Sequence, residues 1–248
     1  MLVAFTLRQA VAAISPILAD IRVDVPVSDI DVGLLGTLPP VLFAASGFLD
    51  PRRIGLDGGI VLALALLTVG HLVRAFAPGF VVLLAGSVVA FAGTGIGNVL
   101  LPAIVRRYFP DRVALLTAVY VCVVGVSTSV PAALAAPIAE HSGWRFSLGT
   151  WSATSVIALV PWFLIIARDR RQRLSDAVAV ESPPPAPVTR LWRSRVALSI
   201  TVAFSTSTIC TYAAFAWLPQ ILVDVALVTT IPAFTLARPA FVEDELEL

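Results

Sequence analysis

The feature that most constrains the fold of this chain is a long apolar run over residues 80–105, which contains no charged residue. A helix needs about 20 apolar residues to cross the hydrocarbon core of a bilayer, because each residue contributes about 1.5 Å of rise. The run supplies this length with room for tilt, and the basic pair Arg106 and Arg107 follows it directly. The pattern predicts a membrane-spanning helix.

The composition of the whole chain agrees with this prediction. The 248 residues are 58% hydrophobic and 13% charged, whereas a soluble domain carries roughly a quarter charged residues. We therefore predict an all-α, polytopic membrane protein whose first partner is the lipid bilayer.

Further apolar runs predict a bundle of six spans over residues 1–167. The predicted spans are residues 1–19, 32–49, 59–75, 80–105, 113–138 and 146–167. The first span is interrupted by Arg8-Gln9 and again by Ser15-Pro16, and a polar connector is predicted over residues 20–31.

The chain changes character after the sixth predicted span. Residues 168–195 are rich in arginine and proline, which predicts a solvated linker rather than a packed element. Residues 196–222 predict a seventh transmembrane helix. The tail, residues 223–248, is atypical, because two prolines, an arginine and an acidic end interrupt any span of adequate length.

The arginines predict the orientation, since the chain contains no lysine. The connectors after the second, fourth and sixth spans hold most of the arginines, whereas the other three connectors hold only Arg22, Arg74 and Arg145. Loops rich in basic residues stay in the cytoplasm. We therefore expect a protein of the inner (plasma) membrane with a cytoplasmic amino terminus and a cytoplasmic linker.

The fourth span contains small and polar residues that a simple membrane anchor does not need. Gly93 and Gly97, four residues apart, predict a flat face toward a neighbouring helix. Asn98 adds a polar amide, and Pro102 removes a backbone donor one turn later. Two interpretations stay open: close helix packing with Asn98 bonded to an adjacent helix, or a role in a solute path.

Arg8 is the second polar feature of the predicted bundle, because it lies inside the first span. An arginine within a membrane costs at least a few kcal/mol and is by default a functional candidate. The alternative is that its long side chain reaches the interface from a shortened helix start.

Several other activities have no support in the sequence. His71 and His141 are the only histidines, so no histidine cluster can hold a metal, and we expect no cofactor and no nucleic-acid partner. The predicted spans contain no paired carboxylates, which argues against an enzyme and against proton coupling. Cys122 and Cys210 lie in apolar runs and are predicted to be small core residues.

A set of local motifs carries a resemblance to a known family. The motifs are Leu7-Arg8 with residues 15–18 (SPIL), residues 33–39 (GLLGTLP), 95–103 (GIGNVLLPA), 109–112 (FPDR), 116–120 (LTAVY), 143–145 (GWR) and 217–219 (WLP). With six spans, a basic linker and a seventh span, the chain resembles one half of a major facilitator superfamily transporter together with the start of the second half. The motifs are similar to those of the cyanate-permease branch, which includes nitroimidazole-type transporters.

This resemblance implies secondary transport of a small, often anionic solute. It implies that Arg8 attracts the anion, that Asn98 and Tyr120 donate hydrogen bonds to it, and that Trp217 and Gln220 line the cavity from the seventh helix. Structural or gating roles are implied for Gly93, Gly97 and Pro102, and for Asp50, Arg52 and Arg53, which remain from the superfamily loop Gly-x-x-x-Asp-Arg-x-Gly-Arg.

The chain also departs from the family pattern. Gln9 stands where the family has proline, and the resemblance covers residues 7–227, so five expected helices are absent, as in a truncated chain. Three interpretations follow. The chain is a transporter fragment that is inactive alone, a half-transporter that forms a homodimer, or a non-transport subunit that associates with a full-length relative.

Overall fold

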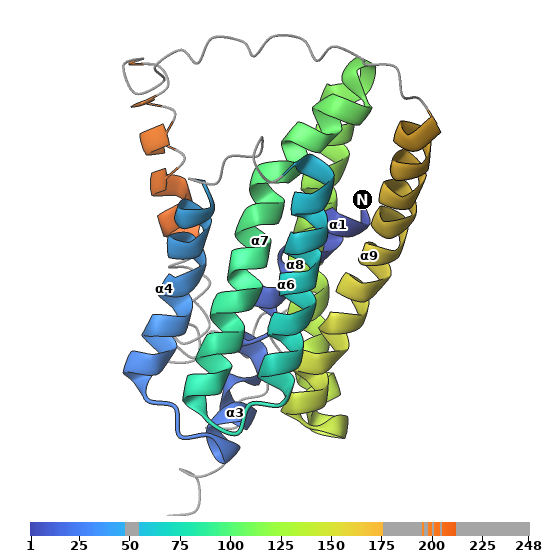
Figure 1. Cartoon of the computed structure of the whole chain (residues 1–248). Helices are drawn as coiled ribbons and strands as arrows, with labels where there is room; N and C mark the ends of the chain where they lie inside the picture. Colours follow the sequence, from blue (N-terminus) through green and yellow to red (C-terminus); the bar gives the residue numbers. More distant parts are fainter. Residues whose placement is uncertain (48–54, 176–194, 196–197, 200, 204, 212–248) are drawn as a thin grey trace, which may run out of the picture.

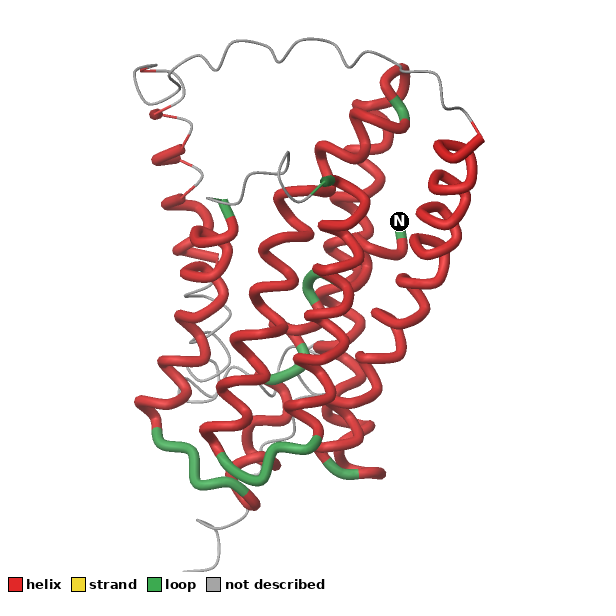
Figure 2. Tube along the Cα trace, in the orientation of Figure 1, coloured by secondary structure: helices red, strands yellow, loops and turns green. Residues whose placement is uncertain are grey.

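The structure is a computed structural model that describes residues 1–47, 55–175, 195, 198–199, 201–203 and 205–211. Within these residues the regular structure is helical and no strand occurs (Figure 2). Six stretches are long and apolar enough to cross a membrane: Leu2–Asp24, Asp29–Ser46, Leu56–Ala75, Phe80–Tyr108, Pro110–Ser142 and Trp144–Ile166. The all-α bundle of six spans predicted from the sequence is confirmed.

Five long helices and one broken span make up the bundle. The long helices are α4 (Asp29–Ser46), α6 (Leu56–Ala75), α7 (Phe80–Tyr108), α8 (Val113–Ser142) and α9 (Trp144–Ser175). They run up and down beside one another (Figure 1). The α6–α7 and α8–α9 connections lie at the lower end in this view, and the α7–α8 connection lies at the upper end.

The first span is broken at both places that the sequence indicated. It consists of α1 (Leu2–Thr6), α2 (Gln9–Ala12), the 3₁₀ turn η1 (Ser15–Ile17) and α3 (Leu18–Asp24). Pro16 explains the second interruption, because proline has no backbone N–H to continue an α-helix. At the first interruption, Arg8 is the residue before α2, with φ −101° and ψ −13°.

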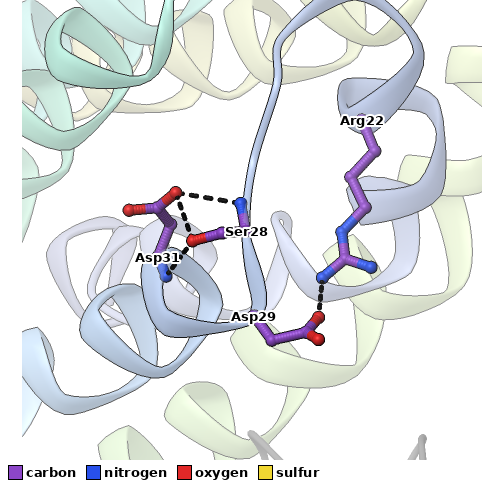
Figure 3. Close-up of polar contacts among 4 residues, drawn as sticks. All are labelled: Arg22, Ser28, Asp29 and Asp31. Carbon is purple, nitrogen blue, oxygen red and sulfur yellow. Dashed lines mark hydrogen bonds and ion pairs between the residues drawn. The ribbon is translucent and has the colours of Figure 1, made fainter.

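The predicted polar connector over residues 20–31 is wrong in its length. Helix α3 continues to Asp24, and α4 already begins at Asp29. Ser28 caps α4, since its hydroxyl accepts a 3.3 Å bond from the Asp31 N–H while the Asp31 carboxylate accepts a 2.9 Å bond from the Ser28 N–H (Figure 3). An ion pair of 2.6 Å between Arg22 and Asp29 also ties α3 to α4.

Helices α6 and α7 pack backbone to backbone through glycines. A Cβ atom at Gly70 of α6 would lie 2.5 Å from the backbone nitrogen of Ala90, and one at Gly93 of α7 would lie 2.6 Å from the carbonyl oxygen of Ala63. Helix α7 uses other glycines for other neighbours: Gly95 faces Ser46 of α4, and Gly97 faces Leu7. The prediction of one flat face toward a single helix is therefore wrong, because Gly93 and Gly97 face two different elements.

Helix α8 contacts the bundle along a narrow stripe and leaves much of its apolar surface exposed. The buried stripe includes Ser127, Pro131, Ala135 and Ala139, which are spaced one turn apart. Cys122 lies off this stripe and is exposed, as is Cys210, so the prediction that both are core residues is wrong. In a membrane protein an apolar run faces lipid as readily as it faces the core, so apolar context does not establish burial.

Helix α9 continues through Ser175, beyond the predicted end of the sixth span at residue 167. Residues 176–194 of the predicted linker lie outside the described residues, as does the atypical tail. Residues 198–199, 201–203 and 205–211, in the predicted seventh span, are helical, and the rest of that span is not described.

Candidate functional site

The junction between α1 and α2, residues 7–10, lies where four long helices meet. Each of its four residues contacts a different helix, through a side chain or a backbone atom. The partners, in order, are Gly97 of α7, Ser127 of α8, Thr154 of α9 and Arg74 of α6. The break in the first span is therefore held at the centre of the bundle.

Arg8 is the charged residue of this junction. Its backbone N–H donates a 3.2 Å hydrogen bond to Oγ of Ser127, and its side chain is half-buried. The first N–H groups of a helix have no partner within that helix, so the Ser127 hydroxyl satisfies a group that the break exposes. The break in the helix thus places a half-buried arginine at the junction, with its backbone N–H bonded to α8.

The structure brings the chain segments that carry Arg8 and Asn98 together. Gly97 packs against Leu7, so a Cβ atom there would overlap with Cδ2 of that leucine. Asn98 follows Gly97 and Arg8 follows Leu7 in the sequence. The Asn98 side chain is half-buried and has no hydrogen-bond partner among the described residues, which leaves its amide available to a ligand.

Tyr120 reaches the same region from α8. Its side chain is half-buried and packs against the apolar cluster that contains Leu7 and Leu100. Its hydroxyl forms no hydrogen bond within the part of the chain that the structure describes. Arg8, Asn98 and Tyr120 thus come from three elements that meet at the junction, and their role in binding stays a prediction.

The remaining predicted site residues fall into two groups. Gly93 and Gly97 are buried at helix contacts, and Pro102 is exposed within α7, which stays helical through it to Tyr108. The other five lie outside the described residues: Asp50, Arg52, Arg53, Trp217 and Gln220.

Gln9, which stands where the resemblance implies proline, is fully buried. The Thr154 hydroxyl lies 2.5 Å from Oε1 of Gln9 and 2.7 Å from the carbonyl oxygen of Trp151. A hydroxyl has one proton, so it donates to only one of these oxygens at a time. Nε2 of Gln9 is buried and has no partner among the described residues.

Arg74 is a polar residue at the end of the predicted third span, counted for orientation with the connector that follows it, and no site role was predicted for it. It lies within α6, its exposed fraction is 0%, and its Nε donates a 3.0 Å bond to Oγ of Ser87. Its NH1 donates a 2.7 Å bond to the carbonyl oxygen of Ala10, and its guanidinium carbon lies 4.8 Å from the centre of the Phe91 ring. The apolar residues 75–77 that follow it were a signal that the arginine lies inside the span.

A second polar cluster joins three elements at the lower end of the bundle in Figure 1. The carboxylate of Asp24 accepts bonds from the indole N–H of Trp144 at 2.9 Å and from the guanidinium of Arg145 at 2.5 Å. Arg145 also donates a 3.4 Å bond to the carbonyl oxygen of Ala77. These bonds join the end of α3, the α6–α7 connection and the start of α9.

The upper end of α6 and α7 is joined in a similar way. The hydroxyl of Tyr108 donates a 2.8 Å bond to Asp57, and Arg107 lies 3.7 Å from the other oxygen of that carboxylate. The broken span therefore lies among helices that are tied together at both ends.

Comparison with known proteins places this geometry in a family. The family model for the Major Facilitator Superfamily matches residues 1–237. The 2-nitroimidazole transporter of Escherichia coli (strain K12) is 30% identical over 228 residues, which are 90% of this chain and 56% of that protein. The uncharacterized transporter YycB of Bacillus subtilis (strain 168) is 26% identical over 226 residues, 89% of this chain and 54% of the relative.

A third relative is the cyanate transport protein CynX of Escherichia coli (strain K12). It is 25% identical over 172 residues, which are 68% of this chain and 45% of that protein. This chain therefore spans about half the length of the curated relatives that it matches.

Proposed function

Because the chain belongs to the Major Facilitator Superfamily, we propose that its six spans form the half of a secondary transporter that binds a small anionic solute. The bundle lies in the inner membrane, with its basic connectors in the cytoplasm. Arg8 supplies the positive charge for the solute, and Asn98 and Tyr120 supply hydrogen bonds.

The observation that carries this proposal is the position of Arg8 at the α1–α2 junction. A half-buried guanidinium beside a helix break, at a junction that also contacts the segments carrying Asn98 and Tyr120, is costly in a bundle that only spans a membrane. A ligand that accepts hydrogen bonds offsets this cost.

The names of the relatives fit the same chemistry. Cyanate, the solute in the name of one relative, is a small monovalent anion, and its charge suits a guanidinium. A nitroimidazole, named in another, carries nitro oxygens that accept hydrogen bonds from the same donors. We therefore expect the solute of this chain to be small, planar or linear, and rich in acceptor atoms.

The length relationship favours a second candidate, in which the chain works together with another bundle. The chain spans about half of its relatives, and α8 exposes large apolar residues such as Leu115, Val121 and Val126. A second copy of the chain, a full-length relative or lipid can each cover such a surface. The dimeric half-transporter and the associated subunit both predict a complex larger than one chain.

Equilibrium binding to the purified full chain tests the proposal, because binding does not require the chain to complete a transport cycle. Radiolabelled cyanate is the probe, and binding to wild-type protein should saturate. Arg8→Gln should weaken binding at least about tenfold, since a charge-assisted hydrogen bond is worth about 1.5–3 kcal/mol. Arg112→Gln is the matched control, because Arg112 is exposed at the end of the bundle.

Two results would contradict the proposal. Equal affinities for Arg8→Gln and wild type would remove Arg8 from the site. Loss of binding in Arg112→Gln to the same extent would show that cyanate responds only to the overall charge of the protein.

A further inference from the structure

A group of buried polar atoms between α2, α6 and α9 has no hydrogen-bond partner among the described residues. Apart from Nε of Arg22, these are the unpartnered buried side-chain atoms of the described chain. The atoms are Nε2 of Gln9, Nδ1 and Nε2 of His71, NH2 of Arg74, Nε1 of Trp151 and Oγ of Ser155. We call these five residues the donor cluster.

The register of α6 against α9 places the donor cluster at one level of the bundle. A Cβ atom at Gly149 of α9 would lie 3.3 Å from Cβ of Ala75 in α6, so the two helices approach closely at this point. The two helices run in opposite directions (Figure 1), and both rise about 1.5 Å per residue. His71, one turn before Ala75, is therefore level with α9 between Trp151 and Ser155.

Two hydrogen bonds bring the other members to the same level. Gln9 contacts Thr154, which precedes Ser155 in the sequence. Arg74 bonds to the carbonyl oxygen of Ala10, the residue after Gln9. The five residues thus lie at about one level of the bundle, where the broken first span meets α6 and α9.

Donors outnumber acceptors in the donor cluster, although His71 and Ser155 can also accept hydrogen bonds. The unpartnered atoms of Gln9, Arg74 and Trp151 can only donate hydrogen bonds, and His71 and Ser155 can each donate one. No carboxylate within the described residues forms an ion pair with Arg74, whose side chain is fully buried. A buried charge without a counter-charge is very costly.

We infer that the donor cluster binds a small monovalent inorganic anion, of the size of chloride or cyanate, with Arg74 as its counter-charge. The anion accepts hydrogen bonds from the free guanidinium nitrogen of Arg74 and from the amide, imidazole, indole and hydroxyl donors. The donor cluster does not include Arg8, and the inference does not rest on the role proposed for Arg8.

The thermal stability of the purified full chain tests this site. The protein is dialysed against chloride, bromide or cyanate, with gluconate added to keep the ionic strength constant, so that general screening does not change. The small anions should raise the unfolding temperature in a saturable way, because a ligand that binds only the folded state stabilises it by mass action. An equal stabilisation by gluconate alone would overturn the inference.

Three substitutions locate the site. Arg74→Gln should lower the apparent affinity for bromide at least tenfold, whereas the exposed control Arg112→Gln should keep the wild-type value. If Arg74→Gln does not fold, Trp151→Phe removes one N–H and keeps a ring in place, and it should weaken binding severalfold. Retention of the wild-type affinity for bromide in Arg74→Gln would place the anion elsewhere and contradict the inference.

A crystal structure of the full chain in bromide gives a direct answer. Anomalous scattering should show bromide between Arg74, His71 and Gln9, and ordered water without bromide at that position would overturn the inference. Competition with cyanate distinguishes the source of the anion. Displacement of bromide by cyanate would assign the donor cluster to the solute path, and binding of halide alone would assign it to a resident ion.

Discussion

The carbonyl oxygen of Ala10 accepts a 2.7 Å hydrogen bond from the buried guanidinium of Arg74. Helix α2 ends at Ala12, and the last carbonyl groups of a helix have no partner within it. An unsatisfied carbonyl inside a membrane protein costs several kcal/mol. The break in the first span and the buried arginine of α6 therefore stabilise each other.

The first prediction concerns the shape of the Arg74 donor. Arg74→Lys keeps the positive charge but replaces the planar guanidinium group, which donates hydrogen bonds to both Ala10 and Ser87. We expect a loss of about 1–3 kcal/mol in the free energy of unfolding, because one buried acceptor loses its donor. Chemical denaturation in detergent measures this loss.

The control for this prediction is Arg112→Lys, at an exposed position. It should change the free energy of unfolding by less than about 0.5 kcal/mol. A value for Arg74→Lys within that same margin would mean that the fork geometry does not contribute to stability.

The second prediction concerns the contact between α6 and α7. In Gly93→Ala the new Cβ would lie 2.6 Å from the carbonyl oxygen of Ala63, so the backbones must separate. We expect a cost of about 1–3 kcal/mol, as for overpacked cores. Gly125→Ala in α8 is the matched control, since nothing lies within 4 Å of its new Cβ.

The two alanine variants should differ in sign as well as in size. Alanine stabilises a helix by about 1 kcal/mol more than glycine does. Gly125→Ala should therefore leave the thermal unfolding temperature unchanged or raise it. If Gly93→Ala is as stable as Gly125→Ala, the close approach of the two helices is not required for folding.

Much of the architecture could be predicted because its causes are local in the sequence. Span length and apolar composition indicate the long helices, and Arg8-Gln9 and Ser15-Pro16 indicate the two breaks of the first span. The predicted length of the connector after that span was wrong, although the start of α4 also has a local cause. Ser28 and Asp31 are three residues apart, which is the spacing of a capping box, and this signal was missed.

The remaining features depend on contacts between distant residues. The burial of Arg74 is determined by Ala10 and Ser87, which belong to other elements. The exposure of Cys122 depends on which side of α8 faces the bundle. Apolar composition cannot predict this side, because lipid and protein interior favour the same residues. The convergence of Arg8 and Asn98 likewise follows from the contact of Leu7 with Gly97.

The third prediction concerns the orientation of the bundle. Asp111 lies in the basic connector between α7 and α8, and Ile30 lies near the start of α4 at the opposite end of the bundle. Both residues are exposed. In a background with Cys122→Ala and Cys210→Ala, a membrane-impermeant maleimide should label Asp111→Cys in inverted vesicles. The same reagent should label Ile30→Cys in intact cells, since basic loops stay in the cytoplasm.

The reverse labelling pattern would contradict the proposed topology. The two positions serve as controls for each other, because they differ only in the end of the bundle that carries the cysteine. Labelling of both from the same side would show instead that the six spans do not all cross the membrane.

The last prediction is that this chain alone does not catalyse transport. A secondary transporter of this superfamily moves one bundle against another around a site between them, and this chain spans about half of its relatives. The half-buried groups of Arg8, Asn98 and Tyr120 need a second polar surface to complete a path for a solute. Purified chain in liposomes should therefore bind cyanate without carrying it across, whereas the cyanate transport protein of Escherichia coli, reconstituted in parallel, should give saturable uptake.

Saturable flux through this chain at a comparable rate would contradict the prediction and favour the dimeric half-transporter. Cross-linking in the same liposomes would then have to show a homodimer, because one six-helix bundle offers no partner to move against.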